Sequence, residues 1–313
     1  MARVTVIIPT HCRPQQLPRA VESARAAGSD VEVIIVDDAS TDDTARVCRN
    51  LEGIKYVRLE HNQGVAGARN VGVLASSADY IALLDDDDLR LPGSLDRQVA
   101  ALEADGAAGF VCGTMLMADQ DGRLTGEVSA PRRQGGDVFW ELLELDFPVM
   151  PISVVIRKEC FTRAGLFDSR LPGLDDWDMF VRIAELYPVA VLDEPVSIYR
   201  QPTPTSGQGS SSQSRHLLRA ARHQLKLLRL PRAASAPARV RSELRARTLK
   251  RIADTLLMNA ARHLSEGSYR PALANGLAAF RLRPSRALRP AGYRRLAEML
   301  LVRGEEPPRV LGR

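Results

Sequence analysis

The sequence predicts an α/β protein with a mostly parallel central sheet and flanking helices, followed by a C-terminal α-helical region. Three observations predict this class. Short apolar runs alternate with helical segments over the first 110 residues. The apolar run 80–84 ends in four consecutive aspartates, and ligands of open α/β sheets bind at the carboxyl ends of strands. Beyond residue 215 the chain becomes basic, rich in Ala and Leu, and helical in its periodicity.

The apolar runs are short and continuous, as in strands that are buried on both faces. Strands separated by helices indicate parallel β-α-β units with right-handed crossovers. The expected strands are 4–8, 31–36, 55–60, 80–84, 108–117, 153–157 and 189–192, and the expected helices are 17–27, 41–51, 67–75, 92–104, 139–145, 158–164 and 176–185. Segment 118–136 is polar and Gly-rich, so we expect a loop there.

Length and composition indicate a globular protein with a sizeable core. The 313 residues are 45% hydrophobic and 26% charged, and no apolar run approaches the roughly 18 residues that a membrane-spanning helix needs. Four scattered cysteines form neither a C-x-x-C pair nor a zinc spacing, which favours a reducing compartment. The N-terminus runs directly into a strand without a signal-peptide pattern, so we expect a cytoplasmic protein.

Charge divides the chain into two regions. Residues 215–313 carry 23 Lys and Arg against 6 Asp and Glu, a net +17, whereas the remainder carries −12. We therefore expect an α/β domain over residues 1–200, a Pro-, Gly- and Ser-rich linker or mobile loop over 201–214, and a basic helical region over 215–313. Its expected helices are 215–229, 238–265, 269–282 and 291–302, and segment 265–284 resembles the second half of a tetratricopeptide repeat.

The basic region has two open interpretations. It could dock on an anionic surface, such as the inner face of a membrane, as a peripheral contact. Alternatively, its arginines could pack against the acidic part of the same chain or of another copy, and codon bias could account for some of them. The sequence leaves both open, and nucleic acid is not expected as a partner.

The acidic run Asp85-Asp86-Asp87-Asp88 is the strongest chemical signal. Like charges at the end of a buried strand repel one another, and a bound divalent cation would remove that cost. Hard cations such as Mg²⁺ take oxygen ligands, usually one or two carboxylates together with substrate phosphates. A solvated acidic turn that caps the next helix is the structural alternative.

Three other segments carry candidate residues. Asp37 and Asp38 follow a second expected strand, where a carboxylate can bind a nucleobase or ribose. In the turn before the helix 67–75, Gly64 and Gly67 would let the backbone approach a phosphate that Arg69 could pair with. Helix capping and an ordinary turn explain these segments without a ligand.

The third segment is Leu174-Asp-Asp-Trp-Asp-Met-Phe-Val-Arg182, which opens a helix. Acidic residues are favoured at helix starts for electrostatic reasons alone. Trp177 beside Asp175 and Asp176 would also make an aromatic and acidic platform for a sugar ring or an acceptor.

These segments, in this order, resemble the family 2 glycosyltransferases, which are inverting enzymes with the Rossmann-like GT-A fold. The resemblance runs from residue 4 to about residue 200, roughly two thirds of the chain. The segments that carry it are Val6-Ile-Ile-Pro-Thr-His-Cys-Arg13, Val36-Asp-Asp-Ala-Ser40, Asn62-Gln-Gly64, Ala68-Arg-Asn70, Leu84-Asp-Asp-Asp-Asp88, Gly165-Leu-Phe-Asp168, Asp175-Asp-Trp-Asp178 and Glu194-Pro-Val-Ser-Ile-Tyr-Arg200.

The resemblance implies roles for the site residues. Asp176 matches the catalytic base, and Asp85 to Asp87 match the D-x-D-type motif, with Asp87 and Asp85 as the metal ligands. The nucleotide-binding positions implied are Pro9, Thr10, Arg13, Asp38, Gly64, Arg69, Asp85 and Asp86, with Asp38 facing the base.

The implied reaction is the metal-dependent transfer of a sugar from a nucleotide sugar to an acceptor hydroxyl with inversion. A UDP-sugar is the donor we expect. Mg²⁺ or Mn²⁺ would neutralise the departing diphosphate, and one carboxylate suffices as base. The acceptor would be a glycan or a lipid-linked molecule of cell-surface polysaccharide or glycoconjugate synthesis. Two alternatives are a non-catalytic nucleotide-sugar-binding or scaffold protein on the same fold, and a nucleotidyltransferase.

Two departures from the family pattern affect these roles. The family usually has Glu-Asp where this chain has Asp175-Asp176, a change that keeps the base. Many GT-A enzymes carry a histidine after the Tyr-Arg segment as a further metal ligand, whereas here Tyr199-Arg200 runs into Gln201-Pro-Thr-Pro. The third protein ligand of the metal is therefore not assigned.

Overall fold

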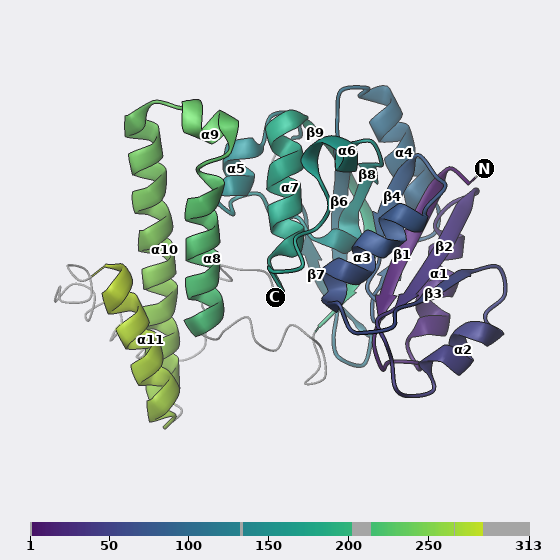
Figure 1. Cartoon of the computed structure of the whole chain (residues 1–313), viewed down its shortest axis with the longest axis horizontal. Helices are drawn as coiled ribbons and strands as arrows, with labels where there is room; N and C mark the ends of the chain where they lie inside the picture. Colours follow the sequence, from purple (N-terminus) through teal and green to yellow (C-terminus); the bar gives the residue numbers. More distant parts are fainter. Residues whose placement is uncertain (1, 132–133, 202–213, 266, 284–313) are drawn as a thin grey trace. The chain divides into compact units, whose positions relative to one another are not determined.

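The computed structural model describes residues 2–131, 134–201, 214–265 and 267–283 (Figure 1). The chain divides into two compact units, Met1–Gln201 and Pro202–Arg313, and each is described here by itself. The first is an α/β unit with one mixed sheet, and the described part of the second is entirely helical.

Across the described residues, nine strands form one sheet in the order β3-β2-β1-β4-β8-β6-β9-β5, with β7 paired to β6. The strands β1 to β4 pair in parallel, as do β6 and β9, whereas β8 runs antiparallel between β4 and β6. The strands are β1 Val4–Thr10, β2 Val31–Asp37, β3 Lys55–Arg58, β4 Tyr80–Leu83, β5 Leu89–Arg90, β6 Phe110–Ala118, β7 Leu124–Ser129, β8 Val154–Arg157 and β9 Val189–Arg200. The predicted fold class, a mostly parallel sheet with flanking helices, is confirmed.

Helices follow most of the strands, as the alternation in the sequence predicted. In the α/β unit they are α1 Leu17–Ala26, α2 Thr44–Asn50, α3 Gly64–Ala75, α4 Ser94–Ala104, α5 Phe139–Leu143, α6 Cys160–Ala164 and α7 Asp175–Leu186, with a 3₁₀ turn at Pro151–Ser153. Pro18 at the second position of α1 fits a helix start, because the amide that proline lacks would have no partner there.

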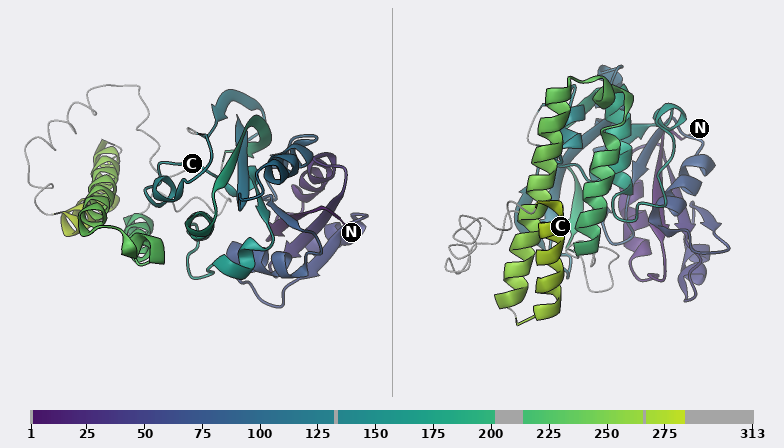
Figure 2. Two further views of the ribbon diagram at one scale, coloured as in Figure 1. Left: turned by 90° about the horizontal axis from the view of Figure 1, so that it is seen from above. Right: turned by 60° about the vertical axis from the view of Figure 1, so that its left-hand side comes forward.

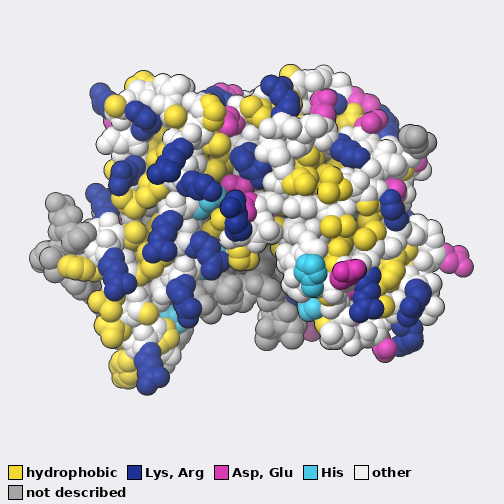
Figure 3. Space-filling model, viewed as in Figure 1, with side chains coloured by type: hydrophobic (Ala, Val, Ile, Leu, Met, Phe, Trp, Pro, Cys, Tyr) yellow, Lys and Arg dark blue, Asp and Glu magenta, His cyan; other side chains and the backbone are white. Residues whose placement is uncertain are grey.

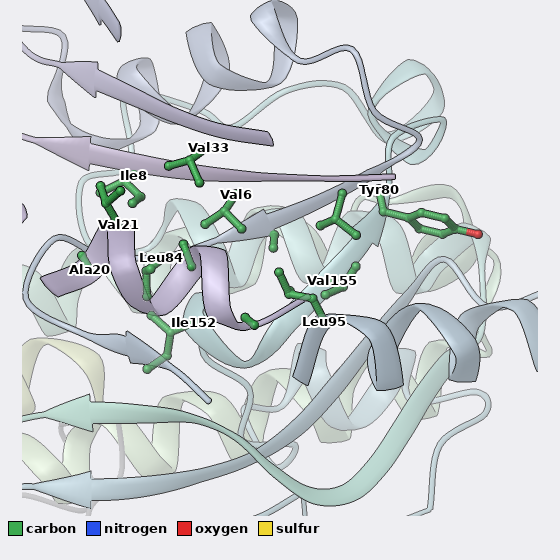
Figure 4. Close-up of a cluster of buried hydrophobic side chains, with 14 of the residues drawn as sticks. Val6, Ile8, Ala20, Val21, Val33, Tyr80, Leu84, Leu95, Ile152 and Val155 are labelled. Carbon is green, nitrogen blue, oxygen red and sulfur yellow. The ribbon is translucent and has the colours of Figure 1, made fainter. Parts of the chain in front are cut away.

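Side chains alternate along the strands, so that one core lies on each face of the sheet. Val6 and Ile8 of β1 lie on the face covered by α1 and α4, where they join one buried cluster with Val33, Leu84 and Leu95 (Figure 4). Ile7 points to the opposite face and packs against α3. The sheet is therefore buried on both faces, as the continuous apolar runs predicted.

The structure differs from the sequence prediction at three strands, of which the two-residue strand β5 was not predicted at all. β7 lies in the segment 118–136 that the sequence predicted as a loop. Its residues are mostly exposed, and even its apolar side chains Leu124 and Val128 are 58% and 57% exposed. β9 continues to Arg200, well past the predicted end at residue 192. Its pairing with β6 shifts register so that Thr114 lies opposite Pro195, and this irregularity accommodates the proline inside the strand.

The helical unit contains α8 Ser214–Leu227, α9 Pro231–Ser235, α10 Ala238–Ser265 and α11 Tyr269–Leu282. Figure 2 shows α10 and α11 side by side, and the buried side chains Leu256 and Ala279 join their small core. Most of the predicted linker 201–214 and the predicted helix 291–302 lie outside the described residues. No helix in the described part of the chain has the length and apolar character needed to cross a bilayer.

Gly72 of α3 provides a test of the packing on the sheet. A Cβ atom at this position would overlap the side chain of Ile7 in β1. Gly72→Ala should therefore lower the free energy of unfolding by about 1–2 kcal/mol, because overpacking outweighs the better helix propensity of alanine. Urea unfolding measures this. Gly276→Ala is the matched control, since a methyl group there meets nothing within 4 Å, and it should be neutral or stabilising.

Candidate active site

The four aspartates leave β4 at the carboxyl end of the central strands, and they divide into two pairs. Asp86 and Asp88 are buried, whereas the side chains of Asp85 and Asp87 keep 26% and 22% of their surface exposed. Burial raises the pKa of Asp87, and repulsion from Asp85 adds to it. Solvent-borne ligands therefore meet Asp85 and Asp87 first.

Asp86 is held by the loop that follows β1. Its carboxylate accepts hydrogen bonds from Thr10 Oγ1 at 2.7 Å and from Arg13 Nη1 at 2.9 Å. The same Arg13 nitrogen lies 3.2 Å from Asp87 Oδ2. Burial raises the pKa of Asp86 to about 6, against the opposing effect of the Arg13 charge. Three predicted nucleotide-site residues thus contact one another, next to Pro9, which is buried in β1.

Arg69 links the acidic loop to the start of α7. It lies in α3, is 4% exposed, and donates from Nη2 to Asp85 at 2.8 Å and from Nη1 to Asp175 at 3.1 Å. Burial lowers the pKa of Arg69, but the surrounding carboxylates raise it more, so that the guanidinium stays charged. Because both of these nitrogens pair with carboxylates of the protein, Arg69 holds the site together rather than reaching freely for a ligand.

Asp176 stands in the first turn of α7 and is half-buried. Its Oδ1 accepts the backbone N–H of Trp177 at 2.7 Å. Burial raises its pKa, partly opposed by the charge of Arg69, and burial also raises the pKa of its neighbour Asp175 to about 6. A carboxylate whose proton affinity is raised in this way is suited to accept a proton from a hydroxyl group.

The predicted sugar platform at Trp177 and Asp175 looks different in the structure. The indole of Trp177 is buried, and its Nε1 donates to the carbonyl oxygen of Leu142 in α5 at 2.7 Å. Asp175 is 1% exposed and paired with Arg69. Trp177 points inward on α7 and packs α5 against α7, so in this structure neither residue offers an open face, and the platform role stays a prediction.

Asp38 and Gly64 also meet, in a way the sequence did not show. Both carboxylate oxygens of Asp38 accept backbone N–H groups, from Gln63 at 2.6 Å and from Gly64 at 2.9 Å. Gly64 adopts φ +75°, a conformation that favours glycine. Asp38 therefore fixes the turn into α3, the helix that carries Arg69, rather than capping the helix of its own loop.

Sequence reasoning missed several residues that position the site. Buried Asp88 accepts the backbone N–H of Arg200 at 2.7 Å, which fastens the end of β9 to the acidic loop. Asn70 exchanges two hydrogen bonds with the backbone of Phe167, at 2.8 and 2.9 Å. The signal for the second pair was present, since the segments containing Asn70 and Phe167 both resembled the family.

Arg200 stands at the end of the Tyr-Arg segment, where the family's histidine would follow. It lines a cleft beside the acidic loop together with Arg19 of α1, Ile198, and the aspartates Asp87 and Asp88. Its backbone is fixed by Asp88, and its Nε donates to the carbonyl oxygen of Gln120 at 2.8 Å. The charged guanidinium of Arg200, rather than a metal-binding histidine, thus lies beside the acidic loop on this side.

The donor set fits a hard divalent cation. In the described residues, no three His, Cys, Asp or Glu side chains converge to enclose a metal by themselves. Asp85 and Asp87, however, are the two more exposed carboxylates of the loop, and they repel each other. Two carboxylates that leave the remaining positions to phosphate and water are the arrangement that Mg²⁺ prefers.

Comparison with known proteins identifies the class. Residues 5–155 match the family described as "Glycosyl transferase family 2". This match identifies residues 5–155, the part of the chain that holds β1 to β4 and the acidic loop, as a glycosyl transferase family 2 region.

Two relatives illustrate the sequence similarity. An uncharacterized glycosyltransferase of Haemophilus influenzae is 27% identical over 185 residues, which cover 58% of this chain and 62% of that protein. The GalNAc(5)-diNAcBac-PP-undecaprenol beta-1,3-glucosyltransferase of Campylobacter jejuni is 34% identical over 135 residues, which cover 41% of this chain and 43% of that protein. The chain thus spans less than two thirds of the length of either relative.

Solved structures of TarS from S. aureus share the fold. The structure of TarS 1-349 aligns over 96% of this chain and 91% of its own, with a TM-score of 0.58 and 18% sequence identity. The complex of TarS 1-349 with UDP-GlcNAc aligns over 87% of this chain and 89% of its own, with a TM-score of 0.56 and 16% identity.

The bridge made by Arg69 generates a stability prediction. Arg69→Met leaves Asp85 and the buried Asp175 without their shared cation, so the free energy of unfolding should fall by about 3 kcal/mol. Asp175→Asn in the same background should recover part of the loss, because it removes the unpaired buried carboxylate. Urea unfolding of the single and double variants measures both effects.

The control for this prediction is Arg170→Met. Arg170 also pairs with an aspartate, Asp168, at 2.8 Å, but its side chain is 82% exposed. Exposed ion pairs contribute little, so this variant should unfold like the unmodified protein. If Arg69→Met also unfolds like the unmodified protein, Arg69 does not hold the site together.

Proposed function

We propose that the protein transfers a sugar from a UDP-sugar to an acceptor hydroxyl with inversion at the anomeric carbon. The observation that carries the proposal is the convergence on Arg69. One guanidinium joins Asp85 of the acidic loop to Asp175, which directly precedes Asp176. Arg69 therefore holds two carboxylates at the same edge of the sheet. Asp85 could bind a cation that neutralises the leaving diphosphate, and Asp176 could act as the base.

The nucleotide would bind over the carboxyl ends of β1, β2 and β4. Pro9 and Thr10 end β1, and Arg13 lies in the loop after it. Asp38 follows β2, and Gly64 is the first residue of α3. Arg13 already pairs with Asp86 and Asp87, so it would shield their charge from the diphosphate. The support for UDP is the fold shared with TarS, which has been solved with UDP-GlcNAc.

Asp85 and Asp87 would hold Mg²⁺ or Mn²⁺, with further positions taken by the diphosphate and water. The cation would neutralise charge on the departing diphosphate as a Lewis acid. The chain's own contribution is orientation: Arg69 fixes the carboxylate of Asp85, and Arg13 contacts that of Asp87.

Asp176 would take the proton of the acceptor hydroxyl as the oxygen attacks the anomeric carbon. The new glycosidic bond forms as the bond to the diphosphate breaks, and the electron pair leaves with the diphosphate. In-line displacement inverts the configuration, and no covalent sugar–enzyme intermediate is required. Burial, which raises the pKa of Asp176, supports this role.

The proposed acceptor is a lipid-linked glycan or related glycoconjugate. The Campylobacter relative is named for an undecaprenol-linked substrate, and the basic composition of the region 215–313 would suit work at an anionic membrane surface. We therefore propose a peripheral location at the inner face of a membrane.

Activity should depend on a divalent cation and on Asp87. Release of UDP from UDP-GlcNAc, used as the first donor to test, should stop in excess EDTA and return with Mg²⁺ or Mn²⁺. Asp87→Ala should lower turnover by on the order of 10²-fold, because charge stabilisation of the leaving group is lost. Asp121→Ala, in an exposed turn, is the control and should keep full turnover. Full activity in EDTA would refute the metal role.

Asp176→Asn should separate chemistry from binding. The amide keeps the shape of the side chain but cannot accept the proton, so turnover should fall by about 10²–10⁴-fold. UDP affinity by calorimetry should change little, because in the proposed role Asp176 would contact the acceptor hydroxyl and not the nucleotide. Asp168→Asn, a change on the loop before α7, is the control for local packing. Loss of UDP binding in Asp176→Asn, or normal turnover, would show that Asp176 is not the base.

A further inference from the structure

An exposed apolar stripe runs along α11. Tyr269, Leu273, Leu277 and Phe280 are 73%, 66%, 50% and 42% exposed. At 100° per residue these four positions fall within a narrow arc of the helix, while Ala272, Ala278 and Ala279 face the core of the unit. The stripe extends over about 16 Å of the helix axis. Four large apolar side chains on one line of a helix are more than scattered surface residues.

Arginines border this stripe. Arg270 and Arg281 are exposed and lie on α11 next to the arc of apolar residues, with Arg283 one position beyond the helix end. Over residues 214–265 and 267–283, the unit carries 16 Lys and Arg but only Glu243 and Asp254 as acidic residues. In Figure 3, hydrophobic side chains and Lys or Arg side chains alternate over the end of the unit where Figure 1 shows α11.

We propose that this α11 stripe is the surface by which the protein docks on an anionic lipid bilayer. This proposal specifies the surface for the proposed membrane location. It rests on the proposed function only for the reason why the protein would dock on a membrane. A helix with an apolar stripe beside a basic edge lies in the plane of the membrane interface, with its apolar side chains at the headgroup boundary. Tyr269 suits that depth, because its ring is apolar and its hydroxyl group can stay hydrated.

The basic residues favour an anionic lipid surface over a second copy of the chain as the partner of this apolar stripe. A second copy of the same helix would bring Arg270 and Arg281 of both copies toward one another, which disfavours pairing. An anionic leaflet instead attracts every basic residue near it, within a Debye length. The apolar stripe supplies contact that salt does not screen, so the docking should weaken in high salt without disappearing.

Vesicle sedimentation of the full chain tests the proposal. The protein should bind vesicles of phosphatidylcholine with phosphatidylglycerol and bind weakly to phosphatidylcholine alone. Leu273→Ser with Leu277→Ser should reduce binding to the anionic vesicles by about tenfold or more, because the apolar contact is lost. Val240→Ser on α10, which is 37% exposed, is the matched control and should leave binding unchanged.

A second pair of variants separates the position of charge from its amount. Arg270→Gln with Arg281→Gln should weaken anionic binding by roughly tenfold. Arg241→Gln with Arg245→Gln removes the same charge from the exposed start of α10 and should weaken it much less. Equal loss in both pairs would mean diffuse attraction and would overturn the stripe as the docking surface.

Two further outcomes would also overturn it. One is unchanged vesicle binding in Leu273→Ser with Leu277→Ser. The other is a dimer in solution that this variant dissociates, which would make a second copy the occupant. UDP release from UDP-GlcNAc, measured without vesicles on the same variants, keeps this test separate from the proposed function. Normal UDP release with lost docking supports the stripe, whereas inactive protein that still docks counts against the proposed chemistry alone.

Discussion

The arrangement of the site depends on the ion pairs that the buried guanidinium of Arg69 makes with Asp85 and Asp175. The helix α3 carries this guanidinium, and two other segments, the loop after β4 and the start of α7, bring carboxylates to it. Each carboxylate would be costly to bury alone, and the shared cation makes their proximity favourable. The same packing requires α3 to lie close on the sheet, which Gly72 permits, and requires its first turn to be fixed, which Asp38 does.

Much of this could be predicted from the sequence. The apolar runs located the strands of the first half, because strands buried on both faces show no alternation that could be confused with a surface pattern. The aspartates after β4 marked the site, since that many adjacent carboxylates have few structural explanations. The segments of the candidate site could be recognised because the residues of each segment are adjacent in the sequence, as Asp85 to Asp88 are.

Other features could not be predicted, for identifiable reasons. Trp177 looked like a ligand platform because its sequence neighbours are acidic, but the direction of a side chain depends on which turn of α7 faces α5. The base-binding role of Asp38 stays a prediction, whereas its second role was not visible in the sequence, because only the fold brings the amides of Gln63 and Gly64 to its oxygens. The extension of β9 past Pro195 depended on register shifts in its pairing with β6, where β9 carries the extra residues, and such a shift leaves no local signal.

The end of β9 has a consequence for how such proteins diversify. Arg200 donates its backbone N–H to Asp88, and Gln201 donates its own to the carbonyl oxygen of Ala118 at 2.9 Å. The α/β unit thus completes its hydrogen bonding at the last residue before the second unit begins. A different C-terminal module joined after Gln201 would leave these two hydrogen bonds of the α/β unit in place. Recombination at this junction would exchange the helical unit while keeping the acidic loop and α7 together on one inherited segment.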